Sequence, residues 1–219
     1  MRRVRVKICG ITKLEDLHVA VEAGADALGF IVDVPQSPRN LSIDEAKRLM
    51  KETPILIKRV AVTVFRDVDQ ILRIYDELKP DAIQVHGGSL AGKQMHKILG
   101  HIPIIRAINI VSREDLKRAL IEAEFFDAIL ADSHVPGKYG GTGITHDWIL
   151  SRKLREMIRP KPLILAGGLK PENVREAILL VKPFAVDVSS GVERKPGIKD
   201  RDKIISFIKE VRRVELCLN

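Results

Sequence analysis

Two residues that can transfer protons stand at the ends of predicted strands, far apart in the sequence. Cys9 ends the apolar run in KICGIT, and Asp132 ends a second apolar run, just before SHVPGKYGGTG. A thiol or a carboxyl group at such a position serves as an acid or a base when its surroundings adjust its pKa. A lone cysteine is also a common core residue, and an aspartate at a strand end often caps the next loop.

Lys7 and His86 are the ionisable residues that bear most directly on Cys9. Side chains alternate along a strand, so Lys7 lies on the same face as Cys9, where its ammonium would favour the thiolate. A thiolate that acts as a nucleophile usually needs a histidine partner, and His86 is the only histidine at a predicted strand end. From the residues alone, Cys9 is a candidate base or a candidate nucleophile.

Small residues follow the last two predicted strands. They are Gly167 and Gly168 after one strand, and Ser189, Ser190 and Gly191 after the other. Backbone N–H groups in such loops can converge on an anion, so we expect the ligand to be a phosphate ester. Three other strand ends carry polar or flexible residues, namely Arg39, Gln84 and the glycine-rich segment after Asp132, which includes Gly141 and Gly143. Together with Lys7 and His86, these residues are candidates for substrate binding.

The elements that must position these residues follow one repeating pattern. Short β-branched runs alternate with amphipathic helical stretches along the whole chain, which is typical of parallel strands joined by helices. The predicted strands are Val4 to Cys9, Asp26 to Ile31, Ile55 to Val64, Asp81 to Val85, Ile104 to Ile108, Asp127 to Ala131, Leu163 to Ala166 and Phe184 to Val188. Capping boxes are expected at Thr12 with Glu15, Ser42 with Glu45, and Ser112 with Asp115.

A weak sequence similarity that recurs in every second predicted strand favours a closed barrel over an open sheet. The segments ADALGF, PDAIQV, FDAILA and PFAVDV fall on the second, fourth, sixth and eighth predicted strands. Alternate strands of an eight-stranded barrel fill the same interior layers. We therefore predict one α/β domain over residues 1–219, a (β/α)8 TIM barrel without insertions. Its active site is expected on the loops that follow the strands.

Charge and composition narrow the classes of partner. Lys and Arg number 37 against 29 Asp and Glu, and aromatic residues make up only 4%. Basic residues are mixed with acids on helical faces, which favours a small anionic ligand over nucleic acid. No apolar run is long enough for a membrane span. The two cysteines are too far apart in sequence for a redox or metal motif, so a cytoplasmic location is expected.

Two motifs that would imply other chemistry are incomplete. GGSLAGK, at residues 87–93, starts like a phosphate-binding P-loop, but Gln94 stands where a serine or threonine is required. The six histidines form no HExxH or similar pair, so we expect no catalytic metal.

Several segments together resemble the phosphoribosylanthranilate isomerase family of tryptophan biosynthesis. The matching segments, in order, are KICGIT, GADALGF, SPR, QVHG, Asp132 with YGGTG, LAGGLKPENV, FAVDVSSGVE and PGIKD. The resemblance implies an Amadori rearrangement of N-(5-phosphoribosyl)anthranilate without a cofactor or metal. Asp132 would then protonate the ribose ring oxygen, and Cys9, as a thiolate, would take the C2′ proton. Arg39 would pair with the anthranilate carboxylate, while the glycine and serine loops would hold the phosphate.

Some features differ from the family pattern or leave alternatives open. Val32, Asn40 and Thr63 stand where relatives usually carry aromatic rings, so the way the anthranilate ring is held is open. Other phosphosugar barrels, such as a pentose-phosphate epimerase or indole-glycerol-phosphate synthase, and a barrel that only binds a metabolite or RNA, are the alternatives. The chain is expected to be a monomer or a homodimer, and the 30% of charged residues is typical of thermophilic proteins.

Overall fold

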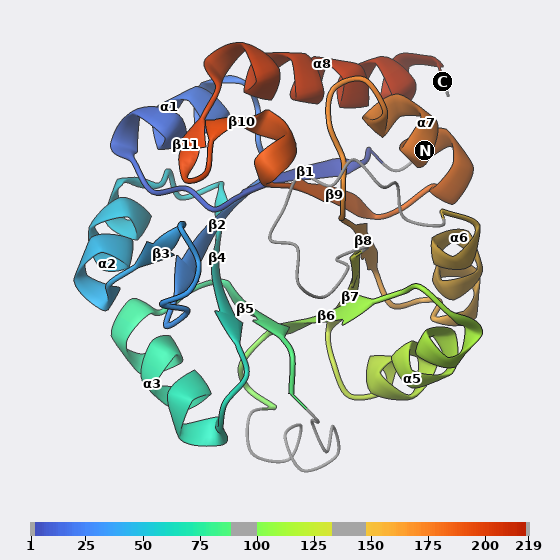
Figure 1. Ribbon diagram of the computed structural model, residues 1–219, viewed down its shortest axis with the longest axis horizontal. Helices are drawn as coiled ribbons and strands as arrows, with labels where there is room; N and C mark the ends of the chain where they lie inside the picture. The colour runs from blue at the N-terminus through green and yellow to red at the C-terminus, as the bar shows by residue number, and fades with distance from the viewer. Residues whose placement is uncertain (1–2, 89–99, 133–147, 218–219) are drawn as a thin grey trace.

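The chain forms a closed barrel of eight parallel strands surrounded by helices (Figure 1). The structure is a computed structural model and describes residues 3–88, 100–132 and 148–217, with side chains described up to residue 214. Strand β1 pairs with both β2 and β9, which closes the sheet. The barrel strands are β1 (Arg5–Cys9), β2 (Ala27–Val32), β4 (Lys58–Val64), β5 (Ala82–His86), β6 (Ile104–Asn109), β7 (Ala128–Asp132), β8 (Leu163–Leu165) and β9 (Ala185–Val188).

The described helices form a layer around the barrel, and α8 packs against both α7 and α1 to complete it (Figure 1). Their bounds are α1 (Leu14–Glu22), α2 (Ile43–Glu52), α3 (Val68–Leu78), α5 (Arg113–Ala123), α6 (Trp148–Met157), α7 (Val174–Val181) and α8 (Arg201–Cys217). The predicted TIM barrel and all eight predicted strands are confirmed, with ends that differ by no more than one residue except at the start of the third strand. In the described residues, no helix combines the length and the apolar character that a membrane crossing requires.

The third predicted strand begins later than expected. The sequence pattern predicts its start at Ile55, but β4 starts at Lys58. The preceding residues turn back, with the Ile57 N–H donating to the Pro54 carbonyl at 2.9 Å. Ile55 and Leu56 are 98% and 90% exposed in this turn. Their apolar side chains produced the strand prediction, but in the part of the chain that the structure describes no strand pairs with them.

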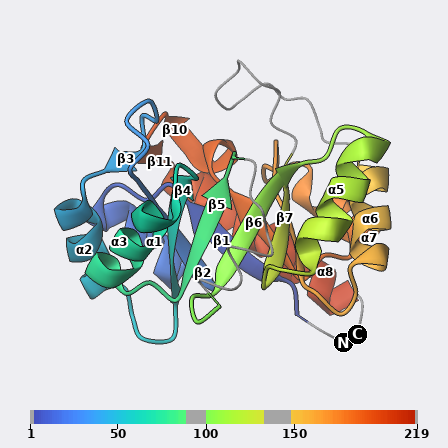
Figure 2. The ribbon, with the colours of Figure 1, turned by 90° about the horizontal axis from the view of Figure 1, so that it is seen from below.

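The loops after β2 and β9 carry short elements that correct the prediction of a barrel without insertions. Strand β3 (Asn40–Leu41) pairs with β2, and β10 (Glu193–Lys195) pairs with β11 (Ile198–Lys199) as a small hairpin. A 3-10 turn, η1 (Ser190–Val192), precedes the hairpin. Figure 2 shows β3, β10 and β11 together at the end of the barrel where the strands terminate. Two-residue and three-residue strands leave too little periodicity to be seen in sequence.

Two of the three predicted capping boxes are confirmed. Ser42 with Glu45, and Ser112 with Asp115, make both reciprocal hydrogen bonds at the starts of α2 and α5. The prediction at Thr12 is wrong, because α1 has Lys13 as its N-cap without a side-chain bond. The Thr12 hydroxyl instead donates to the carbonyl of Gly197 at 2.6 Å, next to β11. The hydroxyl thus makes a tertiary hydrogen bond in place of the capping hydrogen bond that the local motif predicts.

Strand alternation sorts side chains into two cores. Ile8, Phe30 and Ile83 point outward and are fully buried against the helices. Cys9, Val60 and Val62 instead form a cluster inside the barrel. Because the register of β1 against β2 is fixed by its outward face, the inward face must present Lys7 and Cys9 to the barrel interior.

Candidate active site

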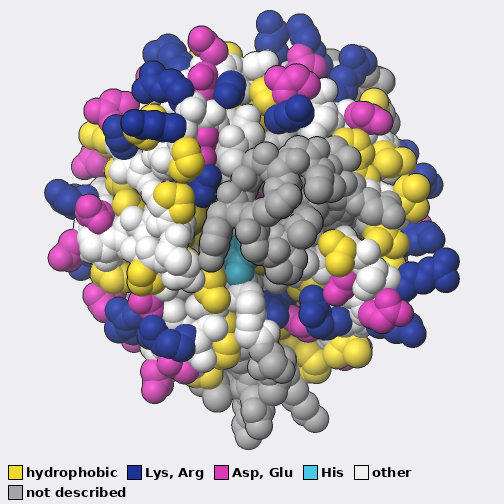
Figure 3. Space-filling model, in the orientation of Figure 1, with side chains coloured by type: hydrophobic (Ala, Val, Ile, Leu, Met, Phe, Trp, Pro, Cys, Tyr) yellow, Lys and Arg dark blue, Asp and Glu magenta, His cyan; other side chains and the backbone are white. Residues whose placement is uncertain are grey.

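A pocket of about 610 Å³ opens at the end of the barrel where the strands terminate. Figure 3 looks onto this end, where a histidine side chain is visible near the centre and basic and acidic side chains are mixed around the outer rim. Apart from Arg118 on α5, the residues around the pocket come from the barrel strands other than β1 or from the segments that follow those strands, which is where barrel enzymes place their chemistry. The predicted site residues among them are Arg39, His86, Asp132, Gly167, Gly168, Ser189, Ser190 and Gly191.

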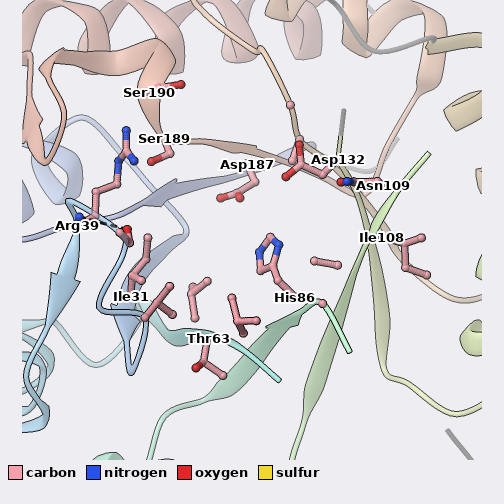
Figure 4. A pocket seen from close by; sticks show the side chains of 18 of the residues that line it. Ile31, Arg39, Thr63, His86, Ile108, Asn109, Asp132, Asp187, Ser189 and Ser190 are labelled. Atoms are coloured by element: carbon pink, nitrogen blue, oxygen red, sulfur yellow. Dashed lines mark hydrogen bonds between the residues drawn. The ribbon is translucent and has the colours of Figure 1, made fainter. Parts of the chain in front are cut away.

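Asp132 and Arg39 lie on opposite sides of the pocket (Figure 4). Asp132 is the last residue of β7, and its carbonyl accepts a hydrogen bond from the N–H of Ile110 at 3.0 Å. Arg39 comes from the loop between β2 and β3, half the barrel circumference away from β7. A carboxyl group and a guanidinium group in this arrangement can contact two ends of one ligand.

Cys9 lies inside the barrel, just below the residues that line the pocket. Its side chain packs with Val60 and Val62, and Val62 also lines the pocket. The thiol is a free cysteine and is 5% exposed. The absence of a side chain at Gly29 makes room for the thiol, because a Cβ at Gly29 would lie 2.8 Å from the Cys9 Sγ.

A buried ion pair connects Cys9 to the pocket wall. Lys7 is 3% exposed, hydrogen-bonds the sulfur of Cys9 and donates from Nζ to the Asp187 carboxylate at 2.9 Å. Asp187 lines the pocket, while Lys7 does not. The sequence predicts Lys7 as a substrate-binding residue, but the structure places it one step behind the wall, where it can act on ligand only through its partners.

Burial raises the pKa of the Cys9 thiol above its ordinary value of 9.0. The charges of Lys7 and Lys199 act in the opposite direction, and the carboxylate of Asp187 adds to the rise. The expected effect of Lys7 on the thiolate is therefore present but is outweighed by burial. A raised pKa favours the protonated thiol in the free protein at neutral pH.

Direct titration of the thiol should therefore give a midpoint above pH 9.0. Thiolate absorbs near 240 nm, so the absorbance difference between the native protein and a Cys9→Ser variant isolates this one group from Cys217. Since the folded pKa is raised, the protonated form persists as pH rises past 9.0 and is lost only above it. A midpoint near 7 would show that the Lys7 charge dominates over burial and would contradict a raised pKa.

Arg39 is held by a carboxylate that the sequence analysis did not single out. Its Nε donates to Glu193 Oε1 at 2.8 Å, and its Nη2 donates to Glu193 Oε2 at 2.6 Å. Glu193 begins the β10 strand and is 7% exposed. This bond is bidentate, so it fixes both the position and the plane of the guanidinium.

The two loops predicted to bind phosphate meet at the pocket wall. Gly167 and Gly168 have φ values of 81° and 63°, which other residues rarely adopt. A Cβ at Gly191 would lie 1.9 Å from the carbonyl oxygen of Leu169, so only glycine lets the two loops approach each other. Among the described residues, the buried Ser189 hydroxyl has no hydrogen-bond partner and can donate to a bound anion.

Of the remaining predicted residues that the structure describes, His86 lines the pocket and Gln84 does not. Gln84 is 2% exposed beneath the pocket, and its Nε2 lies 2.7 Å from Nε2 of His86, which lines the pocket. Gly141 and Gly143 lie outside the described residues. Sequence reasoning missed Asp187, Glu193 and Lys199 as site residues. Asp187 lies in the eighth predicted strand, and Glu193 and Lys199 follow it, all within the FAVDVSSGVE and PGIKD segments.

Comparison with known proteins gives one consistent result. The family model for N-(5'-phosphoribosyl)anthranilate isomerase matches residues 6–210. The isomerase of Thermotoga petrophila is 46% identical over 95% of this chain and 98% of its own. The chain also superposes with TM-score 0.83 and 43% identity on an isomerase crystallised with reduced 1-(o-carboxyphenylamino)-1-deoxyribulose 5-phosphate, covering 96% of this chain and 99% of that one.

A third relative adds information on assembly. It is a crystal structure of monomers generated from the dimeric isomerase of Thermotoga maritima, also with TM-score 0.83, 43% identity and coverage of 96% and 99%. Identity of this degree over nearly the whole of each chain, together with the same barrel, leaves no other family in question. The chain belongs to the N-(5'-phosphoribosyl)anthranilate isomerase family.

Proposed function

We propose that this protein converts N-(5-phosphoribosyl)anthranilate into 1-(o-carboxyphenylamino)-1-deoxyribulose 5-phosphate by general acid–base catalysis. The observation that carries the proposal is the pocket itself, in which Asp132 faces Arg39 and the two small-residue loops, above the buried Cys9. A substrate with a phosphate at one end and a carboxylate at the other matches anchors placed on different sides of one cavity.

The first step assigns Asp132 as the acid. As a carboxylic acid it gives its proton to the ribose ring oxygen, the C1′–O bond breaks, and the nitrogen lone pair forms the C1′=N bond of a Schiff base. Its position at the end of β7 places it in the pocket wall next to Asn109, and a group fixed on a strand end needs little reorganisation to transfer a proton (Figure 4).

The second step assigns Cys9 as the base. Its thiolate takes the proton from C2′, the electrons of that C–H bond form the C1′=C2′ bond of an enolamine, and the π electrons of the C1′=N bond return to the nitrogen. Protonation at C1′ and loss of the proton from the C2′ hydroxyl then give the aminoketone. The ammonium of Lys7, bonded to the sulfur and held by Asp187, stabilises the thiolate while it exists.

The apolar wall between β2 and β4 offers a place for the anthranilate ring. Ile31, Val34 and Val62 line the pocket on the side of Arg39. Val32 faces the helices and is fully buried, and the Asn40 side chain accepts a hydrogen bond from the N–H of Val34 at 2.8 Å. Aliphatic side chains thus take the place of the aromatic rings that relatives usually carry, and we propose that they hold the ring by apolar contact.

The test is an assay with freshly generated phosphoribosylanthranilate, followed by the loss of anthranilate fluorescence. Enzyme-dependent loss at a rate that saturates with substrate is expected. Tight binding of the substrate without any turnover would instead show a barrel that only binds a phosphorylated metabolite, and would overturn the proposal.

The assembly proposed is a homodimer that works in the cytoplasm. The dimeric isomerase of Thermotoga maritima is a close relative, and Ile55 and Leu56 expose a contiguous apolar pair at the end of the barrel opposite the pocket. A base that must remain a free thiol also favours a reducing compartment. Light scattering should give a mass twice that of one chain, and the double variant Ile55→Lys, Leu56→Lys should give half of that; a native mass of one chain would reject the dimer.

A further inference from the structure

We propose that Glu193 and Lys199 are positioning residues that orient Arg39 so that one edge of its guanidinium is presented to a carboxylate ligand. The inference rests on the proposed function, because it takes the ligand to be the anthranilate carboxylate. The inference adds two residues on the hairpin formed by β10 and β11. Neither residue lines the pocket or contacts the reacting atoms.

Lys199 is buried and its ammonium group connects three segments of the chain by hydrogen bonds. Its side chain has no exposed surface, and its Nζ donates to the carbonyl of Cys9 at 2.6 Å, to the carbonyl of Ser189 at 3.2 Å and to Glu193 Oε1 at 2.9 Å. Three acceptors match the three N–H groups of an ammonium. One cation therefore fixes the end of β1, the phosphate loop after β9 and the carboxylate of Glu193 relative to one another.

Glu193 passes this constraint to Arg39. Its Oε1 accepts from both Lys199 and Arg39, and its Oε2 accepts from Arg39. The two cations share one buried carboxylate, and the hydrogen bonds and charges of Arg39 and Lys199 hold the pKa of Glu193 below its usual value. The group of three keeps a net positive charge, which is suited to an arriving anion.

The geometry of the bond leaves one edge of the guanidinium for ligand. Glu193 occupies Nε and one N–H of Nη2. Within the part of the chain that the structure describes, Nη1 has no hydrogen-bond partner, so the edge formed by Nη1 and Nη2 can receive a second carboxylate in the same bidentate way. Arg39 lines the pocket, whereas Lys199 and Glu193 do not. The orientation of Arg39 is thus set by Glu193, which lies outside the pocket lining.

The stem of Arg39 is fixed by packing as well. A Cβ at Gly10 would lie 2.6 Å from Cδ of Arg39 and 3.1 Å from Oγ of Ser189, so the arginine lies directly over the backbone that follows Cys9. With the stem held by Gly10 and the head by Glu193, the side chain has little rotamer freedom left to lose when ligand binds. Without Glu193, the head would have to be ordered by the ligand itself.

The test measures binding of the reduced product analogue, which carries the ring carboxylate, and of the same compound with a plain phenyl ring. Glu193→Gln should weaken binding of the carboxylated compound by at least ~10-fold, because the amide is neutral and its NH2 group cannot accept the hydrogen bond that Oε2 accepts from Arg39 Nη2. The carboxylate-free compound should bind with a Kd within about 3-fold of that of the native protein. Lys199→Met should show the same split, and thermal denaturation checks that each variant is folded.

The matched controls are Glu176→Gln on α7 and Lys195→Met on β10, both at exposed positions, which should leave both affinities unchanged. If Glu193→Gln is too unstable to measure, Glu193→Asp keeps the charge and shortens the reach, and should show the split in weaker form. Equal weakening of both compounds in these variants would indicate a merely structural role and would overturn the proposal.

Arg39→Ala separates this inference from the proposed function. It should weaken the carboxylated compound strongly, raise KM, and leave Glu193→Gln with no further effect in the double variant. If Arg39→Ala discriminates between the compounds but Glu193→Gln does not, the positioning role is wrong and the proposed function stands. If Arg39→Ala itself does not discriminate, the carboxylate assignment of the proposed function is wrong.

Discussion

Replacement of Cys9 by alanine is expected to lower kcat by at least ~100-fold, with the barrel still folded. The reaction needs a group that removes the C2′ proton, and alanine has none. The thiol is small and packs in the inner cluster with Val60 and Val62, so its removal leaves a modest cavity and should cost about 1 kcal/mol of stability. Steady-state turnover measures the first effect, and thermal denaturation measures the second.

The other cysteine provides the matched control for this substitution. Cys217→Ala makes the same chemical change near the C-terminal end of the sequence and should leave kcat unchanged. Cys9→Ser tests the kind of chemistry, since a serine hydroxyl is a far weaker base and should act better as pH rises. If Cys9→Ala keeps a kcat near that of the native protein, another group takes the proton and the assignment of Cys9 is wrong.

Asp132→Asn is expected to lower kcat by a similar factor, at least ~100-fold. Asparagine has nearly the same shape as aspartate and can still form hydrogen bonds, but it cannot give up a proton to the ring oxygen. The carbonyl of Asp132 that holds the N–H of Ile110 belongs to the backbone and survives the change. The effect should therefore be on turnover, with the Kd of the reduced product analogue changed much less.

Asp69→Asn is the matched control, because Asp69 is exposed in the first turn of α3 and does not line the pocket. Its kcat should equal that of the native protein. A ring-opened substrate offers a further check, since it no longer requires the acid, and a pre-opened analogue should be processed by Asp132→Asn almost as fast as by the native protein. A defect of equal size on both substrates would place Asp132 in another step.

The ends of the strands could be predicted well because they depend on local pattern. Cys9, Asp132 and Arg39 are all recognisable from their places after apolar runs, and the structure brings Asp132 and Arg39 to one pocket with Cys9 beneath it. The capping boxes at Ser42 and Ser112 follow from a local motif of four residues and could be predicted equally well. Thr12 shows the limit of such reasoning, because its hydroxyl bonds to Gly197, which lies 185 residues away.

The charges around the site could not be predicted in the same way. Lys7 is expected from sequence to favour the thiolate of Cys9, since the two share a strand face. Its charge is partly cancelled by Asp187, 180 residues further along the chain, and burial reverses the net direction of the pKa shift. Coulomb interactions and desolvation depend on distance in space and on depth, neither of which is written in neighbouring residues.

By itself, the sequence determined the class of fold, the order of the elements and the chemical groups at the mouth of the barrel, because hydrophobic periodicity and turn residues act over a few positions. Only the tertiary structure decided how those groups are held. Closure of the barrel places β1 beside β9, and this brings Lys7 to Asp187 and Lys199 to the carbonyl of Cys9. The protonation of the thiol and the direction in which Arg39 faces are set by these long-range contacts, whose strength arises from burial in a low-dielectric interior.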